Sequence, residues 1–101
     1  MIIRNARWFD GTGAPSAVRN IAVLDGHIAA VTPHDLDETG CTEVIDAAGK
    51  WVLPGFVDIH THYDVEVLGG SGLPESVRHG VTTILIGSCS LSTVHVGGVD
   101  A

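Results

Sequence analysis

The chain has 101 residues, of which 45% are hydrophobic, and its formal net charge is -7 at pH 7. This acidic balance disfavours binding to the phosphates of nucleic acids or of anionic membranes, so we expect neither as a partner. No apolar run has the length of a signal peptide or of a bilayer span, and we therefore expect a cytoplasmic protein.

The first fifty residues are predicted to form short strands separated by turns. Asp25 and Gly26 stand between two apolar runs, residues 21–24 and 27–31, which is the strongest short signal of a β-hairpin. The other predicted segments are a first strand or strand pair over residues 2–9, a polar loop over 32–40 and a strand over 42–46. Short strands at this spacing are typical of a β-sandwich. We therefore predict a partial β-sandwich domain over residues 1–50.

Two histidines, His60 and His62, follow an apolar run two residues apart. Residues 51–57 are expected to form a strand buried on both faces, as in a parallel sheet covered by helices. Side chains alternate along a strand, so both imidazoles are expected to point the same way. This spacing also occurs on solvated strands, but two imidazoles at the end of a buried parallel strand suit a borderline-soft cation such as Zn²⁺. The pair is therefore predicted to bind a metal.

A helix and a further strand are predicted after the histidines. Pro74 suits the first turn of a helix, and Gly80 can take the left-handed conformation that ends one. Residues 81–86 are apolar and β-branched, as in a strand, and residues 63–80 suffice for a parallel crossover, which needs about a dozen. Cys89 would follow the carboxyl end of this strand, where its thiolate could share a cavity with both imidazoles.

These motifs resemble the amino-terminal part of the metal-dependent amidohydrolases, in particular the D-aminoacylase (N-acyl-D-amino-acid deacylase) branch. The resemblance rests on three stretches: the opening Ile2-Ile-Arg-Asn-Ala, residues 48–64 around the histidines, and the run from His79 to Cys89. It implies one or two Zn²⁺ ions, with His60, His62 and Cys89 as ligands. One departure is that Ser88 and Ser90 flank this cysteine where the family usually has asparagine and glycine, which bears on the subfamily and hence on the substrate.

The resemblance also implies a fold and a reaction. The fold is mixed β and α/β, in which the partial β-sandwich is followed, over residues 51–101, by the first two βα units of a (β/α)8 TIM-like barrel. The reaction is hydrolysis of the linear amide C–N bond of small N-acyl-D-amino acids by a metal-activated water. The general base, an aspartate, and further histidine ligands are expected beyond residue 101. The chain is therefore interpreted as an incomplete hydrolase, inactive alone, whose barrel is completed by missing chain or by self-association.

Two other interpretations stay open. A cyclic amidase, such as a dihydropyrimidinase or dihydroorotase, shares the spaced histidine pair but has no need of a thiolate at the second strand. The other is a noncatalytic metal-binding or assembly fragment, which the end of the sequence at Ala101 favours. Within the deacylase interpretation, the residues that could contact the substrate or orient a ligand are Tyr63, Asp64 and His95. The alternatives are a solvated turn carboxylate for Asp64 and a structural role for His95.

Overall fold

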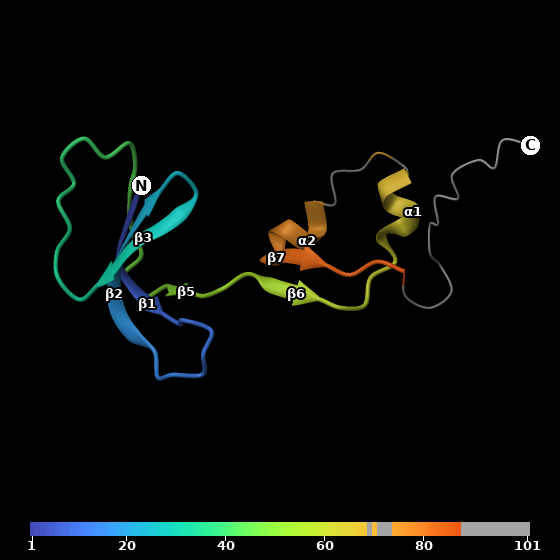
Figure 1. The fold of residues 1–101 in the computed structure, drawn as a ribbon, viewed down its shortest axis with the longest axis horizontal. Helices are drawn as coiled ribbons and strands as arrows, with labels where there is room; N and C mark the ends of the chain where they lie inside the picture. Colours follow the sequence, from blue (N-terminus) through green and yellow to red (C-terminus); the bar gives the residue numbers. More distant parts are fainter. Residues whose placement is uncertain (69, 71–73, 88–101) are drawn as a thin grey trace, which may run out of the picture. The chain divides into compact units, whose positions relative to one another are not determined.

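The computed structural model describes residues 1–68, 70 and 74–87, and the chain divides into two compact units, Met1–Pro54 and Gly55–Ala101 (Figure 1). Each unit holds its own β-sheet. Among the described residues, no helix has the length and hydropathy that crossing a bilayer requires.

The first unit is built on a five-stranded sheet with the strand order β3-β2-β1-β4, in which β5 also pairs with β1. Strand β2 is antiparallel to both β1 and β3, whereas β4 and β5 run parallel to β1. The bounds are β1 Ile2–Trp8, β2 Ala17–Leu24, β3 His27–Thr32, β4 Val44–Asp46 and β5 Trp51–Val52. The sheet is therefore mixed, with its antiparallel part contributed by the first three strands.

The predicted hairpin is confirmed, because β2 and β3 pair directly on either side of Asp25 and Gly26. Both turn residues have positive φ, 49° and 76°, which is the requirement of the type I′ turn that matches the twist of paired strands. The segment expected as one strand or two is the single strand β1. Its buried side chain Ala6 and that of Ile21 from β2 meet in the core together with Ala47.

The prediction of one strand over residues 51–57 is wrong, because residues 51–52 and residues 56–57 belong to different sheets. Trp51 and Val52 pair with β1 in the first sheet, where the Val52 carbonyl accepts the Phe9 N–H at 2.9 Å. Pro54 then has no N–H to continue a ladder. The boundary between the units accordingly follows Pro54, four residues beyond the position expected from sequence.

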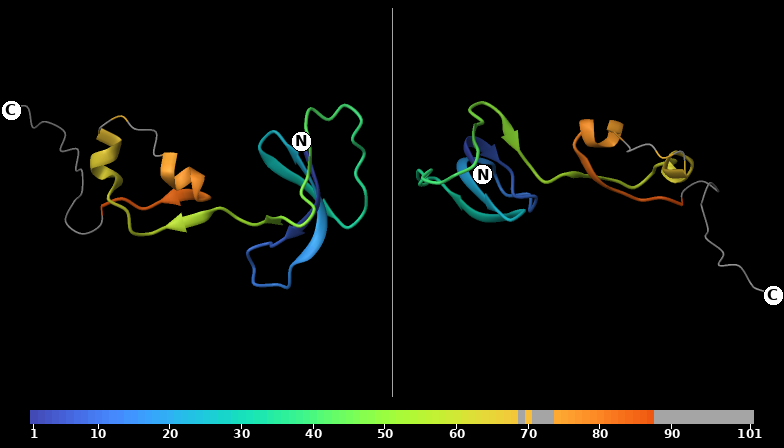
Figure 2. Two further views of the ribbon diagram at one scale, coloured as in Figure 1. Left: turned by 180° about the vertical axis from the view of Figure 1, so that it is seen from behind. Right: turned by 90° about the horizontal axis from the view of Figure 1, so that it is seen from above.

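The second unit contains two parallel strands and two short helices. Strands β6 and β7 run side by side in the views of Figures 1 and 2 and form a two-stranded sheet. The bounds are β6 Phe56–Asp58, α1 Tyr63–Leu68, α2 Pro74–Arg78 and β7 Val81–Ile84. The predicted helix-then-strand order and the parallel pairing are confirmed. Gly80, with φ of 78°, ends α2 as expected.

Helix α1 was not predicted, since the helix expected after the histidines begins only at Pro74. Its first turn carries Asp64 and Glu66, and acidic side chains there stabilise the positive end of a helix. This signal was available in the sequence, but a six-residue helix gives too little periodicity for detection.

Gly55 is required where β6 begins because it lies against Thr82 of β7. A Cβ atom on Gly55 would lie 2.1 Å from the Thr82 Oγ1 atom and 2.7 Å from its Cβ atom. The clash involves the Cβ atom as well as the hydroxyl, so a rotation of the threonine side chain cannot relieve it. The close pairing of β6 with β7 therefore depends on a glycine at this position.

We predict that Gly55→Ala destabilises the second unit by about 1–3 kcal/mol, the usual cost of overpacking a close contact. Urea unfolding of the single variant, of Thr82→Gly and of the double variant gives the coupling free energy between the two sites. Thr82→Gly removes the three atoms nearest to the new methyl group, so the alanine should cost less in that background. An equal cost in both backgrounds would contradict the assigned contact.

Candidate metal site

The two histidines lie immediately after the carboxyl end of β6, which ends at Asp58. The Asp58 carboxylate accepts the backbone N–H of His60 at 3.1 Å and so turns the chain out of the strand. The rings of His60 and His62 are neighbours, with centroids 5.4 Å apart and an angle of 68° between their planes. Both side chains are exposed. The expected location at the end of a parallel strand is confirmed, whereas the expectation that both lie on the strand itself is wrong.

The separation of the imidazoles fits a shared metal ion. Two imidazoles bound to one tetrahedral Zn²⁺ through nitrogens about 2.0–2.1 Å from the ion have ring centres roughly 5 Å apart. The observed 5.4 Å differs from this by an amount that small side-chain rotations absorb. Two ligands do not complete a zinc site, because even catalytic sites use three protein ligands and a water.

Polar side chains anchor the histidine segment to the chain that follows β7. The Thr61 hydroxyl donates to the Leu85 carbonyl at 2.7 Å, and the Gly87 N–H donates to Asp64 Oδ2 at 3.2 Å. Thr61 is only 6% exposed and Asp64 only 4%. Asp64 was proposed from the sequence as a residue that orients a ligand or as a solvated turn carboxylate. Its burial excludes the solvated alternative.

Tyr63 joins the two helices of the second unit. Its hydroxyl shares a hydrogen bond with the Ser76 hydroxyl, which lies on α2 and is 9% exposed. Neither Ser76 nor Thr61 was singled out in the sequence. A serine or threonine on an expected strand or helix carries no pattern that distinguishes a buried hydrogen-bonding role, which depends on the tertiary neighbours.

The profile of the amidohydrolase family matches residues 43–101, which is more than half of the chain. The chain belongs to the amidohydrolase family. The resemblance read from the spaced histidines and the His79–Cys89 run is therefore confirmed.

Relatives of this amidohydrolase are much longer than the chain itself. An uncharacterized protein of Mycobacterium tuberculosis is 61% identical over 101 residues, which make up 100% of this chain and 16% of that protein. The structure of N-acyl-D-glutamate deacylase from Bordetella bronchiseptica, complexed with zinc and a phosphonate mimic of the tetrahedral intermediate, is 36% identical, with a TM-score of 0.74 over 90% of this chain and 19% of that one. A D-aminoacylase variant in complex with copper chloride is 35% identical, with a TM-score of 0.80 over 99% of this chain and 21% of that one.

These likenesses support part of the predicted fold and a metal cofactor. The described residues of the amidohydrolase chain form mostly β-strands in a mixed arrangement that resembles the amino-terminal part of D-aminoacylase structures. The zinc and copper complexes among its structural neighbours support a metal cofactor for the family. The chain spans between 16% and 21% of the length of these three relatives.

The remaining candidate residues of the amidohydrolase chain, Cys89 and His95, lie outside the described residues. Within the part that the structure describes, no group of three or more histidine, cysteine, aspartate or glutamate side chains is placed to hold a metal ion. The described part therefore offers two neighbouring imidazoles, and a zinc site with three protein ligands would need a further ligand from outside it.

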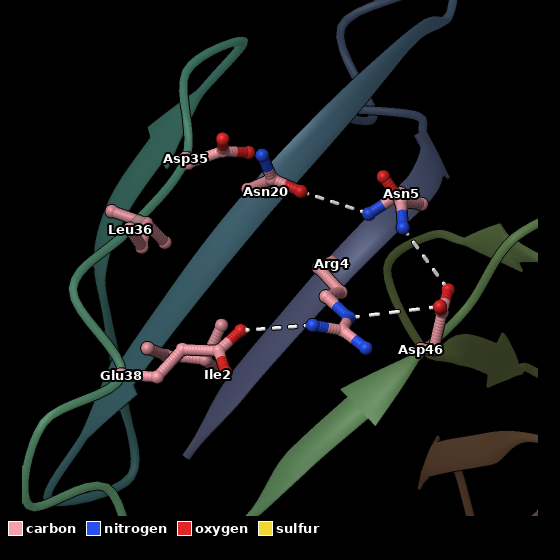
Figure 3. Close-up of a pocket in the computed structure, with 8 residues that line it drawn as sticks. All are labelled: Ile2, Arg4, Asn5, Asn20, Asp35, Leu36, Glu38 and Asp46. Carbon is pink, nitrogen blue, oxygen red and sulfur yellow. Dashed lines mark hydrogen bonds and ion pairs between the residues drawn. The ribbon is translucent and has the colours of Figure 1, made fainter.

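A polar hollow of about 520 Å³ lies in the first unit of the amidohydrolase chain (Figure 3). The Arg4 guanidinium pairs there with Glu38 at 3.2 Å and with Asp46 at 3.6 Å, and the Asn5 side-chain amide donates to Asp46 at 3.1 Å. Asn5, with a φ of 60°, lies in an irregularity of β1, and its N–H donates to the Asn20 side chain at 2.8 Å. These mutual contacts give the hollow a structural role in joining β4 to β1.

The hydrogen bond from the Asn5 side chain, followed by that from the Ala48 N–H, holds the pKa of Asp46 below its ordinary value, and Arg4 and Lys50 lower it further. A carboxyl group whose pKa is lower in the folded than in the unfolded state stabilises the fold at pH values above its unfolded-state pKa. That contribution is lost as the pH falls through the folded pKa.

We therefore predict that Asp46→Asn is less stable than the natural chain at about pH 6, and that this difference shrinks as the pH falls below about 4. Asn5→Gly should behave similarly, because it removes the amide donor and still permits the positive φ. Urea midpoints measured across this pH range test both variants. A stability difference that is the same at every pH would contradict the assignment.

Proposed function

We propose that the chain supplies His60, His62 and Cys89 as ligands to one or two Zn²⁺ ions in a hydrolase that cleaves the amide bond of N-acyl-D-amino acids. The observation that carries the proposal is the pair of imidazoles 5.4 Å apart at the carboxyl end of a parallel strand. The zinc-bound N-acyl-D-glutamate deacylase, 36% identical to this chain, supports both the metal and the substrate class. Cys89 follows Gly87, which ends the described segment beside Asp64, by two residues.

The chemistry divides between the ion and the residues of this chain. Bound zinc lowers the pKa of a coordinated water and polarises the acyl carbonyl. The histidines bind the ion as neutral imidazoles, and the Asp58 carboxylate fixes the backbone of His60 through its N–H. The general base that moves the water proton to the leaving amine is proposed to lie outside these 101 residues, as is the rest of the ligand set.

The proposed architecture makes β6 and β7 the first two strands of a (β/α)8 barrel and the first sheet part of a β-sandwich. An isolated two-stranded sheet is at best marginally stable in water. The apolar side chains of Phe56 and Val57 on β6 are 55% and 63% exposed, and that of Leu85, directly after β7, is 59% exposed. Such exposure is expected of strands that pack against further elements in a complete barrel. Among the described residues, no feature favours the cyclic amidase or the noncatalytic fragment over the deacylase.

Zinc affinity tests the proposed ligands. We predict that His60→Ala, His62→Ala and Cys89→Ser each weaken Zn²⁺ binding to the 101-residue chain, on the order of 100-fold, since the loss of a ligand costs at least as much as the loss of a residue that orients one. His79→Ala is the matched control, because His79 is an exposed histidine of the same unit at the end of α2. Competition titration with a chromogenic chelator gives each affinity. Equal affinity for the natural chain and a ligand variant would remove that residue from the site.

Activity provides a separate test. We predict that the zinc-loaded 101-residue chain releases no measurable amine from N-acyl-D-amino acids, because removal of a general base alone costs about 10²- to 10⁴-fold and the positioning of the substrate is lost as well. An amine-release assay with N-acyl-D-glutamate, run beside buffer with the same zinc concentration, measures this. Turnover above the buffer rate would contradict the assignment of the base to another part of the protein.

A further inference from the structure

The hydrogen bonding between β6 and β7 continues beyond the ends of both strands. There, side chains of the segment after β6 take the place of its backbone and bind the backbone of the segment after β7. The Leu85 N–H donates to the Asp58 carbonyl at 2.8 Å, which is the last backbone contact of the pair. The Leu85 carbonyl then accepts the Thr61 hydroxyl at 2.7 Å, and the Gly87 N–H donates to Asp64 Oδ2 at 3.2 Å. Alternate residues of a parallel strand turn their polar groups to the same neighbour, so residues 85 and 87 continue the ladder register.

These side chains are also the ones that the second unit buries. Among its residues whose burial is described, the buried side chains are Thr61, Asp64 and Ser76, and none of them is apolar. A buried hydroxyl or carboxylate that loses its hydrogen-bond partner destabilises the fold, so the contacts of Thr61 and Asp64 to residues 85 and 87 define where this segment can lie. Thr61 stands between the two histidines, and Asp64 follows His62 by two residues.

We propose that Thr61 and Asp64 are positioning residues of the metal site: their hydrogen bonds to Leu85 and Gly87 fix the histidine segment against the end of β7. The proposal rests on the proposed function, since it takes His60 and His62 as the metal ligands. The role of Asp64 then depends on its acceptor oxygen and not on its charge. A side chain of the same length that keeps such an oxygen should therefore replace it.

The test compares Zn²⁺ affinities of the 101-residue chain and its variants. Asp64→Ala should bind zinc about 10- to 100-fold more weakly, the usual cost of losing a residue that orients a ligand. Asp64→Asn keeps an acceptor oxygen for the Gly87 N–H and should stay within about threefold of the natural chain. Glu75→Ala is the control for charge, because it removes an exposed carboxylate of the same unit that pairs only at the surface with Arg78, and it should leave the affinity unchanged.

A second pair of variants covers the case in which Asp64→Ala does not fold. Thr61→Val has nearly the same shape but no hydroxyl for the Leu85 carbonyl, whereas Thr61→Ser restores the donor. Zinc affinity should fall in the valine variant and recover in the serine variant. Amide hydrogen exchange without metal gives an independent readout: Asp64→Ala should accelerate exchange at Gly87 and leave Leu85, which is held by the Asp58 backbone, protected.

The outcomes separate this proposal from the proposed function. The positioning role is overturned if His60→Ala loses zinc while Asp64→Ala and Thr61→Val bind it as the natural chain does. It is also overturned if Asp64→Asn is as weak as Asp64→Ala, since the charge and not the hydrogen bond would then matter. Retained affinity in His60→Ala and His62→Ala would instead overturn the proposed function, and the positioning role with it.

Discussion

The hydrogen bonds between the segment after β6 and the segment after β7 are the constraint on which the candidate site depends. Strand β6 ends at Asp58, where the carboxylate turns the chain by capping the His60 N–H. Without further contacts, the two histidines would lie on a free loop. Thr61 and Asp64 join that loop to the segment after β7 through part-buried hydrogen bonds, which in the proposed positioning role keep the imidazoles as neighbours.

The two units are stabilised by different interactions. The first has a small apolar core of Ala6, Ile21 and Ala47, beneath a network of polar contacts that joins Arg4 and Asn5 to Asp46. In the described part of the second unit the buried side chains are polar, and large apolar side chains of its strands are exposed. Specific hydrogen bonds and the glycine contact at position 55, more than hydrophobic burial, therefore define the geometry around the histidines.

The sequence predicted those features that local residues determine. Short patterns predicted the Asp25-Gly26 turn, the helix start at Pro74, its end at Gly80 and the strand that follows. The apolar run before the histidines placed them after a parallel strand. Features set by distant partners were missed. Nothing in the run from Trp51 to Val57 reveals that its first two residues pair with β1, and no periodicity indicates that Thr61 and Asp64 replace a backbone ladder.

The central claim is that zinc, as one or two ions, is bound by this histidine pair and by the thiolate of Cys89. X-ray absorption spectroscopy of the zinc-loaded chain, with Cys41→Ser leaving a single thiol, tests it most directly. The account predicts nitrogen scatterers at about 2.0–2.1 Å and one sulfur at about 2.3 Å, with the sulfur lost in Cys89→Ser and imidazole scattering reduced in His60→Ala. A shell composed of oxygen alone, or one unchanged by these substitutions, would contradict the account.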